Sequence, residues 1–255
     1  MEIINFSPSQ KSKDDGDDAT NIIGARKVTD IKQSLKDENR VNIFIDYSFA
    51  FSLDIAQVVD YKLKVGKALS DLEIDRLERA SSFGKLYQNT LEWVLTRPHS
   101  IKETREHLVT KQGKREMANR QALRNRERTK EDRQKYKLRT RELPNITDED
   151  IEQVVTKLIE KGYLDDAKFA RYYIENRFAR KGISQKRLKQ ELQQKGLDSE
   201  VIGEALDATE RSDDEEIQKI IAKKRNKYTD DKLIAYLVRQ GFDYQRAKAA
   251  VRGTD

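Results

Sequence analysis

The amino-acid sequence predicts a mainly α-helical protein in which three tandem three-helix repeats follow a small antiparallel β meander with helices. Charged residues make up 38% of the 255 residues and hydrophobic ones 36%, a balance that favours thin helical layers with solvated faces. From Lys85 onward only Pro98 and Pro144 interrupt the helical pattern. A segment of the C-terminal half also recurs at an offset of 45 residues, as expected for stacked helical units.

Composition excludes several kinds of protein. The chain contains no cysteine, so a disulfide framework, a thiolate metal site and a cysteine nucleophile are all excluded. No segment approaches the roughly 18 consecutive apolar residues that a membrane-spanning helix needs. We therefore expect a soluble cytoplasmic monomer that does not contact membranes.

The N-terminal part is predicted to hold a tail and a small β-containing extension. Residues 1–24 are expected to be a disordered tail, because they are rich in Ser, Lys, Asp and Gly. Residues 25–84 form the predicted extension. Apolar positions within 28–35, 41–45 and 49–53 indicate three antiparallel strands, and helices are expected at 55–61 and 71–83. Ser70 and Glu73 match a capping box for the second helix.

Two C-terminal repeats follow one pattern, which predicts units at 166–210 and 211–255. Aligning Ser184–Leu197 with Thr229–Phe242 pairs Leu188 with Leu233, Leu192 with Leu237 and Gly196 with Gly241. In each unit a Ser or Thr caps the middle helix and leucines four residues apart form its buried stripe. The Gly at its end allows a positive φ, which lets the chain reverse.

A first repeat is predicted at 85–165, interrupted by a basic insertion at 111–143. Leu91 and Val94 belong to its first helix, Ser100 caps its second, and Thr147 or Asp148 caps its third. Between Lys111 and Glu142 there are 13 Lys or Arg and 5 Asp or Glu, a balance of +8 against +6 for the whole chain. Because large apolar residues are few, we expect this insertion to be a solvated helix or a disordered arm that packs little.

Two groups of cations are candidates for binding phosphate or an acidic protein groove. Each group is equally consistent with an ordinary solvated helix face, and the stem of Arg177 could instead cover the core. The insertion contributes Arg120, Arg124 and Arg128, and the second repeat contributes Arg171, Arg177, Arg180, Lys181, Lys186, Arg187 and Lys189.

Catalytic and cofactor sites are not expected. Asp165 and Asp166 could form a paired-carboxylate metal site of a nuclease, but two acids at a helix start are better explained by capping and the helix dipole. His99 and His107 lack ligands at zinc spacing, so we interpret them as surface or packing residues. No Gly-rich phosphate loop is present. The sequence therefore predicts no metal, no cofactor and no enzymatic activity.

The start of the second repeat resembles the RecX regulators of the bacterial recombinase RecA. The residues that carry the resemblance, which we expect to be mainly structural, are Gly162, Tyr163, Leu164, Asp165, Asp166, Phe169, Ala170, Gly182, Leu188, Leu192 and Gly196, together with Arg177. Tyr163, Leu164, Phe169 and Tyr173 are expected in the core. The resemblance spans roughly residues 85–252, and the β-containing part looks like the extension of longer members.

The resemblance implies a function as well as a fold. It implies a protein that lies in the groove of the RecA–DNA filament and inhibits ATP hydrolysis, strand exchange and coprotease activity, in homologous recombination, DNA repair and the SOS response. Direct contact with single- or double-stranded DNA is a further possibility. The long basic insertion departs from the commonest form of the family. The alternative is a stand-alone helical DNA-binding protein, which the same charge pattern permits.

Overall fold

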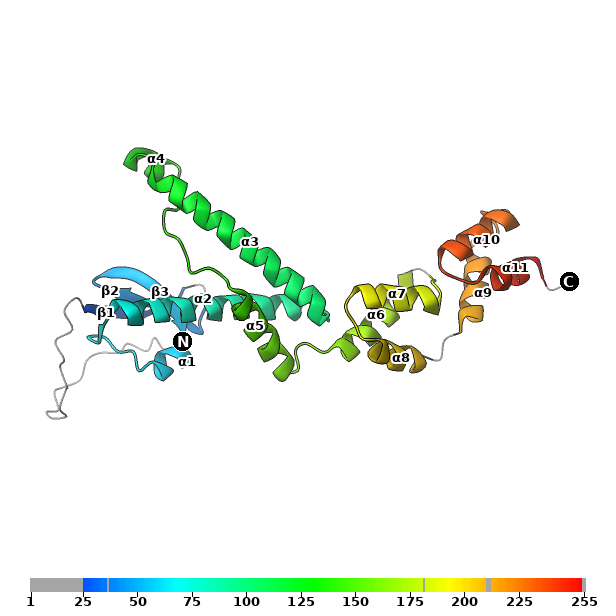
Figure 1. The fold of residues 1–255 in the computed structure, drawn as a ribbon, viewed down its shortest axis with the longest axis horizontal. Coiled ribbons are helices and arrows are strands. Elements are labelled where there is room, and N and C mark those ends of the chain that lie inside the picture. The colour runs from blue at the N-terminus through cyan, green and yellow to red at the C-terminus, as the bar shows by residue number, and fades with distance from the viewer. Residues whose placement is uncertain (1–24, 36, 181, 210–211, 254–255) are drawn as a thin grey trace. The chain divides into compact units, whose positions relative to one another are not determined.

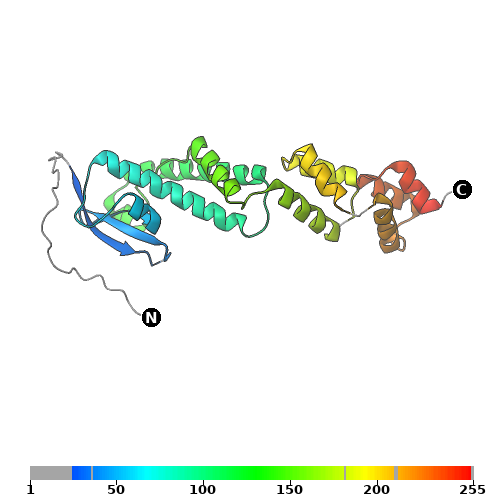
Figure 2. The ribbon, with the colours of Figure 1, turned by 90° about the horizontal axis from the view of Figure 1, so that it is seen from below.

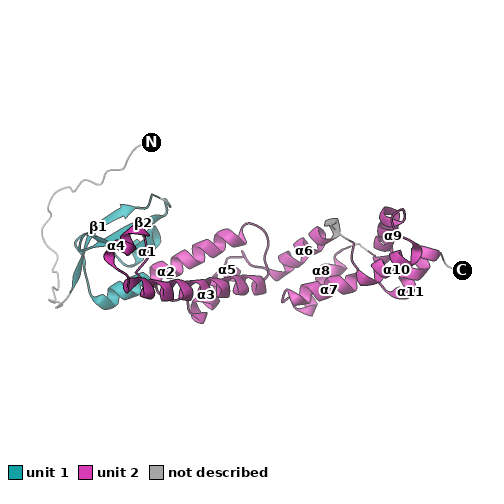
Figure 3. Cartoon of the chain, turned by 90° about the horizontal axis from the view of Figure 1, so that it is seen from above, with its two compact units in different colours: residues 1–78 teal, residues 79–255 magenta. Residues whose placement is uncertain are grey.

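The computed structural model describes residues 25–35, 37–180, 182–209 and 212–253, without the side chains of 178–180. These residues form eleven helices and four strands (Figure 1). The chain divides into two compact units, Met1–Glu78 and Arg79–Asp255, which are coloured separately in Figure 3. The predicted tail at 1–24 lies outside the described residues. No helix in the described ranges is long and apolar enough to cross a lipid bilayer.

The first unit contains the predicted antiparallel meander. Its strands are β1 (Arg26–Gln33), β2 (Arg40–Ile45), β3 (Ser48–Asp54) and β4 (Ala68–Leu69), in the order β3-β2-β1-β4. Val28, Ile43 and Leu53 are fully buried and form the centre of the sheet's core. Asp46 and Tyr47 both have positive φ, as a tight hairpin between β2 and β3 requires. Strand β4 was not predicted, because two residues carry no periodicity.

Two helices follow the meander, and one of them differs from its prediction. Helix α1 (Ile55–Asp60) starts at a capping box formed by Asp54 and Gln57. Helix α2 (Asp71–Val94) begins at the predicted box, in which the Ser70 amide donates to Glu73 Oε2 at 2.8 Å. The predicted end of this helix at Phe83 is wrong. Its buried stripe continues past Gly84 to Leu86 and Val94, and this burial outweighs the weak helix propensity of one glycine.

The second unit contains three groups of helices with separate apolar cores, which confirms the predicted class of tandem three-helix repeats (Figures 1 and 2). The first group combines the end of α2 with α3 (Ile101–Arg126) and α5 (Asp148–Glu160). The second consists of α6 (Asp166–Arg180), α7 (Gln185–Gln194) and α8 (Ser199–Asp207). The third consists of α9 (Asp213–Lys224), α10 (Asp230–Arg239) and α11 (Tyr244–Arg252).

Most of the predicted helix signals are present. The hydroxyls of Ser100 and Ser184 cap α3 and α7, and Thr147 forms a capping box at α5. Gly196 and Gly241 have φ of 87° and 92°, as a reversal after a helix requires. Thr229 occupies the N-cap of α10 but makes no side-chain cap bond.

The basic insertion is partly helical. Helix α3 continues through it to Arg126, and the short helix α4 (Lys130–Lys135) follows. The expectation that the insertion packs little is wrong for one side of α3, where Asn119, Ala122 and Asn125 are buried. The expectation rested on the small number of large apolar residues, whereas these buried positions are small or polar.

Candidate functional site

The turn before the second repeat explains the arrangement of the family motif. Helix α5 ends at Glu160, and Gly162 then adopts a φ of 71°. After this turn the Leu164 side chain is buried in the core. Phe169 and Ala170, in the first turns of α6, are also buried. Tyr163, however, is 43% exposed, so its predicted place in the core is wrong. The left-handed glycine turns the chain so that Leu164, and not Tyr163, fills the apolar position.

Asp165 and Asp166 have different structural roles. Asp165 Oδ1 accepts hydrogen bonds from the amides of Ala167 and Lys168 at 2.9 and 3.0 Å, and bonds of this kind lower its carboxyl pKa. Asp166 Oδ1 instead accepts a bond from the amide of Ile101 at 2.9 Å, and burial raises its pKa. Within the described ranges, no cluster of three or more His, Cys, Asp or Glu could hold a metal ion. The two carboxylates thus accept bonds from backbone amides at the starts of α6 and α3.

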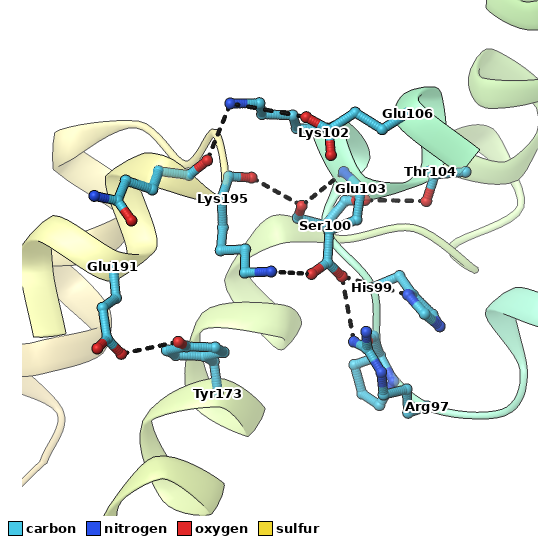
Figure 4. Close-up of polar contacts among 12 residues, drawn as sticks. Arg97, His99, Ser100, Lys102, Glu103, Thr104, Glu106, Tyr173, Glu191 and Lys195 are labelled. Carbon is cyan, nitrogen blue, oxygen red and sulfur yellow. Dashed lines mark hydrogen bonds and ion pairs between the residues drawn. The ribbon is translucent and has the colours of Figure 1, made fainter. Parts of the chain in front are cut away.

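The first and second repeats meet where the start of α3 contacts the end of α7 (Figure 4). Ser100 Oγ donates to the Lys195 carbonyl at 2.8 Å, and Lys102 Nζ donates to the Gln194 carbonyl at 3.0 Å. Lys195 Nζ lies 2.6 Å from Glu103 Oε1. A Cβ at Gly196 would lie 2.6 Å from Lys102 Cβ, so the close approach of the two helices requires a glycine.

The second and third repeats meet through equivalent contacts. The Ser184 amide donates to the Gln240 carbonyl at 3.1 Å, and the Gln185 amide donates to Asp213 Oδ1 at 2.8 Å. Arg187 also bonds the Arg239 carbonyl. A Cβ at Gly241 would lie 2.5 Å from Ser184 Oγ. In both junctions, the start of one middle helix therefore contacts the glycine-terminated end of the next.

Gly182 also lies at the junction of the second and third repeats. A Cβ at this position would lie 2.7 Å from both Glu216 Oε2 and Ile220 Cδ1 on α9. The resemblance to a known family includes Gly182, and the structure shows that a side chain there would have to displace the ends of the Glu216 and Ile220 side chains on α9.

The carboxylate of Glu191 contacts two of the predicted cations of the second repeat. Arg177 contacts Glu191 through two hydrogen bonds, of 2.7 and 2.8 Å, and Tyr173 OH donates to the same carboxylate at 2.9 Å. Arg187 Nε approaches Glu191 at 3.4 Å. The hydrogen bonds from Arg177 make the largest contribution to lowering the Glu191 pKa to about 2.

The remaining predicted cations of this repeat are separate from that carboxylate. Arg171, Lys186 and Lys189 are exposed on α6 and α7. The side chain of Arg180 and all of Lys181 lie outside the described residues. The structure thus brings Arg177 and Arg187 together in an internal ion-pair network and leaves three cations facing solvent.

The basic insertion, residues 111–143, folds back on itself as a basic arm. Asn119 Nδ2 donates to the Leu143 carbonyl at 2.8 Å, while Asn119 Oδ1 accepts a bond from the Leu143 amide at 3.0 Å. Farther along α3, Asn125 Nδ2 donates to the Arg139 carbonyl at 2.8 Å. Near the base of the arm, Arg115 Nη1 donates to the Pro144 carbonyl at 2.8 Å. Side-chain amides and a guanidinium thus hold the returning chain against α3.

Two of the three candidate arginines of the arm lie on α3. Arg120 and Arg124 are exposed on α3 one turn apart, but the helix ends at Arg126 and Arg128 lies beyond it. Glu127 takes the C-cap position, so the spacing of four no longer corresponds to one helical turn.

The two histidines pack around the single tryptophan of the chain. Rings of His99 and His107 lie 3.5 and 4.1 Å from the Trp93 ring, centroid to centroid. Burial is the main cause that lowers the pKa of both imidazoles. Of the two interpretations offered, surface or packing residues, the ring contacts with Trp93 favour packing.

Comparison with known proteins gives the family. The described fold defines a class, helical proteins in which tandem three-helix repeats follow a small β unit along the chain. The RecX second three-helix domain matches residues 165–206, and the regulatory protein RecX N-terminal domain matches residues 26–70. The chain belongs to the RecX family. Its β unit is thus part of the family pattern itself.

Individual relatives agree with this assignment. Regulatory protein RecX of Bacillus licheniformis is 28% identical over 236 residues, which cover 89% of this chain and 77% of the relative. The protein of the same name from Bacillus subtilis is 35% identical over 85 residues, 33% of this chain and 32% of the relative. A crystal structure of regulatory protein RecX has a TM-score of 0.58 at 19% identity, covering 88% of this chain and 98% of that chain, and shows the shared fold.

Proposed function

We propose that this protein binds the RecA–DNA filament in the cytoplasm and inhibits its ATPase, strand-exchange and coprotease activities, without catalysing a reaction itself. The observation that carries the proposal is membership of a family whose curated members are named regulatory proteins. Its setting would be homologous recombination, DNA repair and the SOS response. We take 85–165, 166–210 and 211–255 as its repeat units, acting as a monomer, and assign the cationic contacts with the filament to the second of them.

The two repeat junctions support a role in binding an extended partner. Each junction fixes the start of one middle helix against the end of the next through backbone and side-chain bonds. Neighbouring repeats linked in this way present side chains at fixed separations, which reduces the conformational entropy lost on binding. A repetitive assembly is a suitable partner for such a surface.

The second repeat supplies our candidate contact residues. Arg171, Lys186 and Lys189 are exposed, whereas Arg177 and Arg187 contact Glu191. We assign the first three to binding and the other two to shaping the surface around Glu191. An exposed cation loses little solvation energy when it meets a partner's charge, and it mainly increases the association rate.

Hydrolysis of ATP by DNA-activated RecA tests the proposal. Added protein should lower the rate in proportion to its ratio to RecA, and further DNA should not restore it. Replacing Arg171, Lys186 and Lys189 together by Ala should weaken the inhibition. A control variant removes equal charge from the third repeat at Lys223, Arg246 and Lys248, which are also exposed. An unchanged hydrolysis rate with the unmodified protein would rule out the proposal.

The same assay distinguishes regulation of RecA from the alternative, a stand-alone DNA-binding protein. Such a protein would lower hydrolysis only to the extent that it occupies DNA, so added DNA would restore the rate fully. The exposed cations of the arm and of the second repeat keep this alternative open.

A further inference from the structure

The basic arm is ordered mainly by polar contacts. Asn119 and Asn125 are buried on α3 and bond to the returning chain on both sides of Arg141. Arg126 Nε adds a bond of 2.8 Å to the Thr140 carbonyl. Asparagine is a weak helix former, so its burial at two positions of one helix suggests that its amide is needed there. These bonds hold the arm in one conformation without a large apolar core.

The opposite face of α3 carries cations. At 100° per residue, Lys114, Met117, Arg120 and Arg124 share one side of the helix, facing away from Asn119. All four are exposed. Arg120 and Arg124 are separated by about 6 Å along the helix axis. The arm's buried amides therefore fix the direction in which these cations point.

The tip of the arm extends this positive surface. Arg128, Lys130 and Lys137 are exposed there, and neither they nor Lys114, Arg120 and Arg124 form an ion pair within the part of the chain that the structure describes. Arg126, by contrast, pairs with Glu142 at 3.2 Å. The arm as a whole keeps its balance of 13 cations to 5 anions.

The chemistry of this surface fits nucleic acid better than an acidic protein. A protein interface usually has an apolar centre, but Met117 is the single apolar residue among the four on the cationic face of α3. Duplex DNA presents one negative charge per about 1.7 Å of its axis, so a row of separated cations can neutralise several phosphates at once. A guanidinium also matches phosphate oxygens through paired hydrogen bonds. Tyr136 is exposed at the tip, where Lys135 Nζ lies over its ring at 5.4 Å from the centroid. A base can stack on an exposed ring of this kind.

We propose that the basic arm is a preorganised, sequence-independent binding site for the phosphodiester backbone of nucleic acid. Its cations contact phosphates, and its asparagine bonds keep those cations in register before binding. The inference is independent of the proposed regulation of RecA, because the arm binds DNA in the absence of RecA.

The test is the affinity of the full chain for a fluorescently labelled oligonucleotide, measured by anisotropy over a series of NaCl concentrations. A single strand and its duplex are compared, to identify which form the arm prefers. For the unmodified protein, the logarithm of the association constant should fall linearly with the logarithm of salt concentration. If the protein binds neither the single strand nor the duplex, the proposal is overturned.

Two variants separate charge from preorganisation. In R120Q/R124Q the salt slope for duplex should fall by about 1.8, because each lost phosphate contact removes about 0.9. In N119A/N125A every charge remains, so the slope should stay near that of the unmodified protein while affinity falls several-fold. A matched control, R246Q/K248Q, removes two exposed cations from α11 and should retain both affinity and slope.

The variants test two parts of the proposal, the arm as the binding site and its preorganisation by asparagines. Equal effects of R120Q/R124Q and R246Q/K248Q would overturn the arm as the site, since net charge alone would then explain binding. Unchanged affinity in N119A/N125A would overturn preorganisation. Circular dichroism checks that each variant keeps its helices. RecA ATPase inhibition is measured on the same samples, so failure of the arm proposal is distinguishable from failure of RecA regulation.

Discussion

Asp166 accepts a hydrogen bond of 2.9 Å from the backbone amide of Ile101, which belongs to the preceding repeat. Asp213 accepts the corresponding bond, of 2.8 Å, from Gln185 at the next junction. In both cases the acid is the first residue of its own helix and satisfies an unpaired amide at the start of another. One aspartate per repeat thus links two helix N-termini, which gives the second Asp of the family motif a structural role.

Replacing Asp166 by Ala should therefore destabilise the junction of the first two repeats. The Ile101 amide would lose its partner, and we expect the free energy of unfolding to fall by about 1–3 kcal/mol. Urea denaturation followed by circular dichroism measures the change. Asp213→Ala should lower stability less, because its bond to the Gln185 amide is exposed and water can replace it. Equal stability of Asp166→Ala and the unmodified protein would show that the bond contributes nothing.

Gly196 and Gly162 form a matched pair for a second prediction. Both have positive φ, but a Cβ at Gly162 meets no atom within 4 Å, whereas one at Gly196 meets Lys102 Cβ at 2.6 Å. Gly162→Ala should cost about 1–2 kcal/mol for its backbone conformation alone. Gly196→Ala should cost clearly more, because Lys102 Cβ is fixed by the backbone and α3 must shift. Thermal unfolding compares the two, and equal losses would contradict close packing at this junction.

The network around Glu191 predicts a dependence of stability on pH. Hydrogen bonds, first of all from Arg177, lower the pKa of Glu191 from 4.5 to about 2 in the folded protein. The ionised carboxylate thus stabilises the fold fully above about pH 4.5, and this contribution is lost as the pH falls toward 2. Glu191→Gln should flatten this part of the stability profile, as measured by urea unfolding between pH 2 and pH 6. An identical profile in the variant would exclude the network as its cause.

Trp93 provides a spectroscopic test of the histidine stack. Burial lowers the pKa of His99 and His107, so the midpoint of their protonation should lie below the ordinary histidine value of 6.5. A protonated imidazole stacked on an indole quenches its fluorescence by accepting an electron. Emission should therefore decrease as the pH falls, with a midpoint below 6.5. Folding favours the neutral rings, so their contribution to stability is present above pH 6.5 and is lost as the pH falls below it.

A variant identifies the groups responsible. H99L/H107L should remove the decrease in Trp93 emission while far-ultraviolet circular dichroism stays constant over the same pH range. A midpoint at or above 6.5 in the unmodified protein would contradict the burial of these rings.

Local sequence signals predicted much of the fold. The spacing of Leu188 and Leu192, the cap at Ser184 and the glycine at 196 each act within a few residues of chain, and all three appear as expected. The end of α2 was mispredicted because Gly84 weakens a helix only slightly, and the burial that compensates comes from distant segments.

The candidate site could be predicted only as a set of residue types. Sequence alone could not separate Arg177, which binds Glu191 fourteen positions away, from exposed Arg171 on the same helix. Nor could it show that Asn119 and Asn125 order the arm, because their partners lie on a chain segment that returns after α4. A helical period gives the direction of a side chain along its own helix, but not what it meets there.

The sequence by itself therefore determined the helical repeats, their caps and turns, the meander and the family motif, because periodicity and capping depend on neighbouring residues. Only the tertiary structure decided that Asp166 reaches back to Ile101, that Gly196 faces Lys102 and that the basic arm is held by amides. Each of these contacts joins residues at least fourteen positions apart. Their existence depends on how whole helices pack, and that is a property of the folded chain.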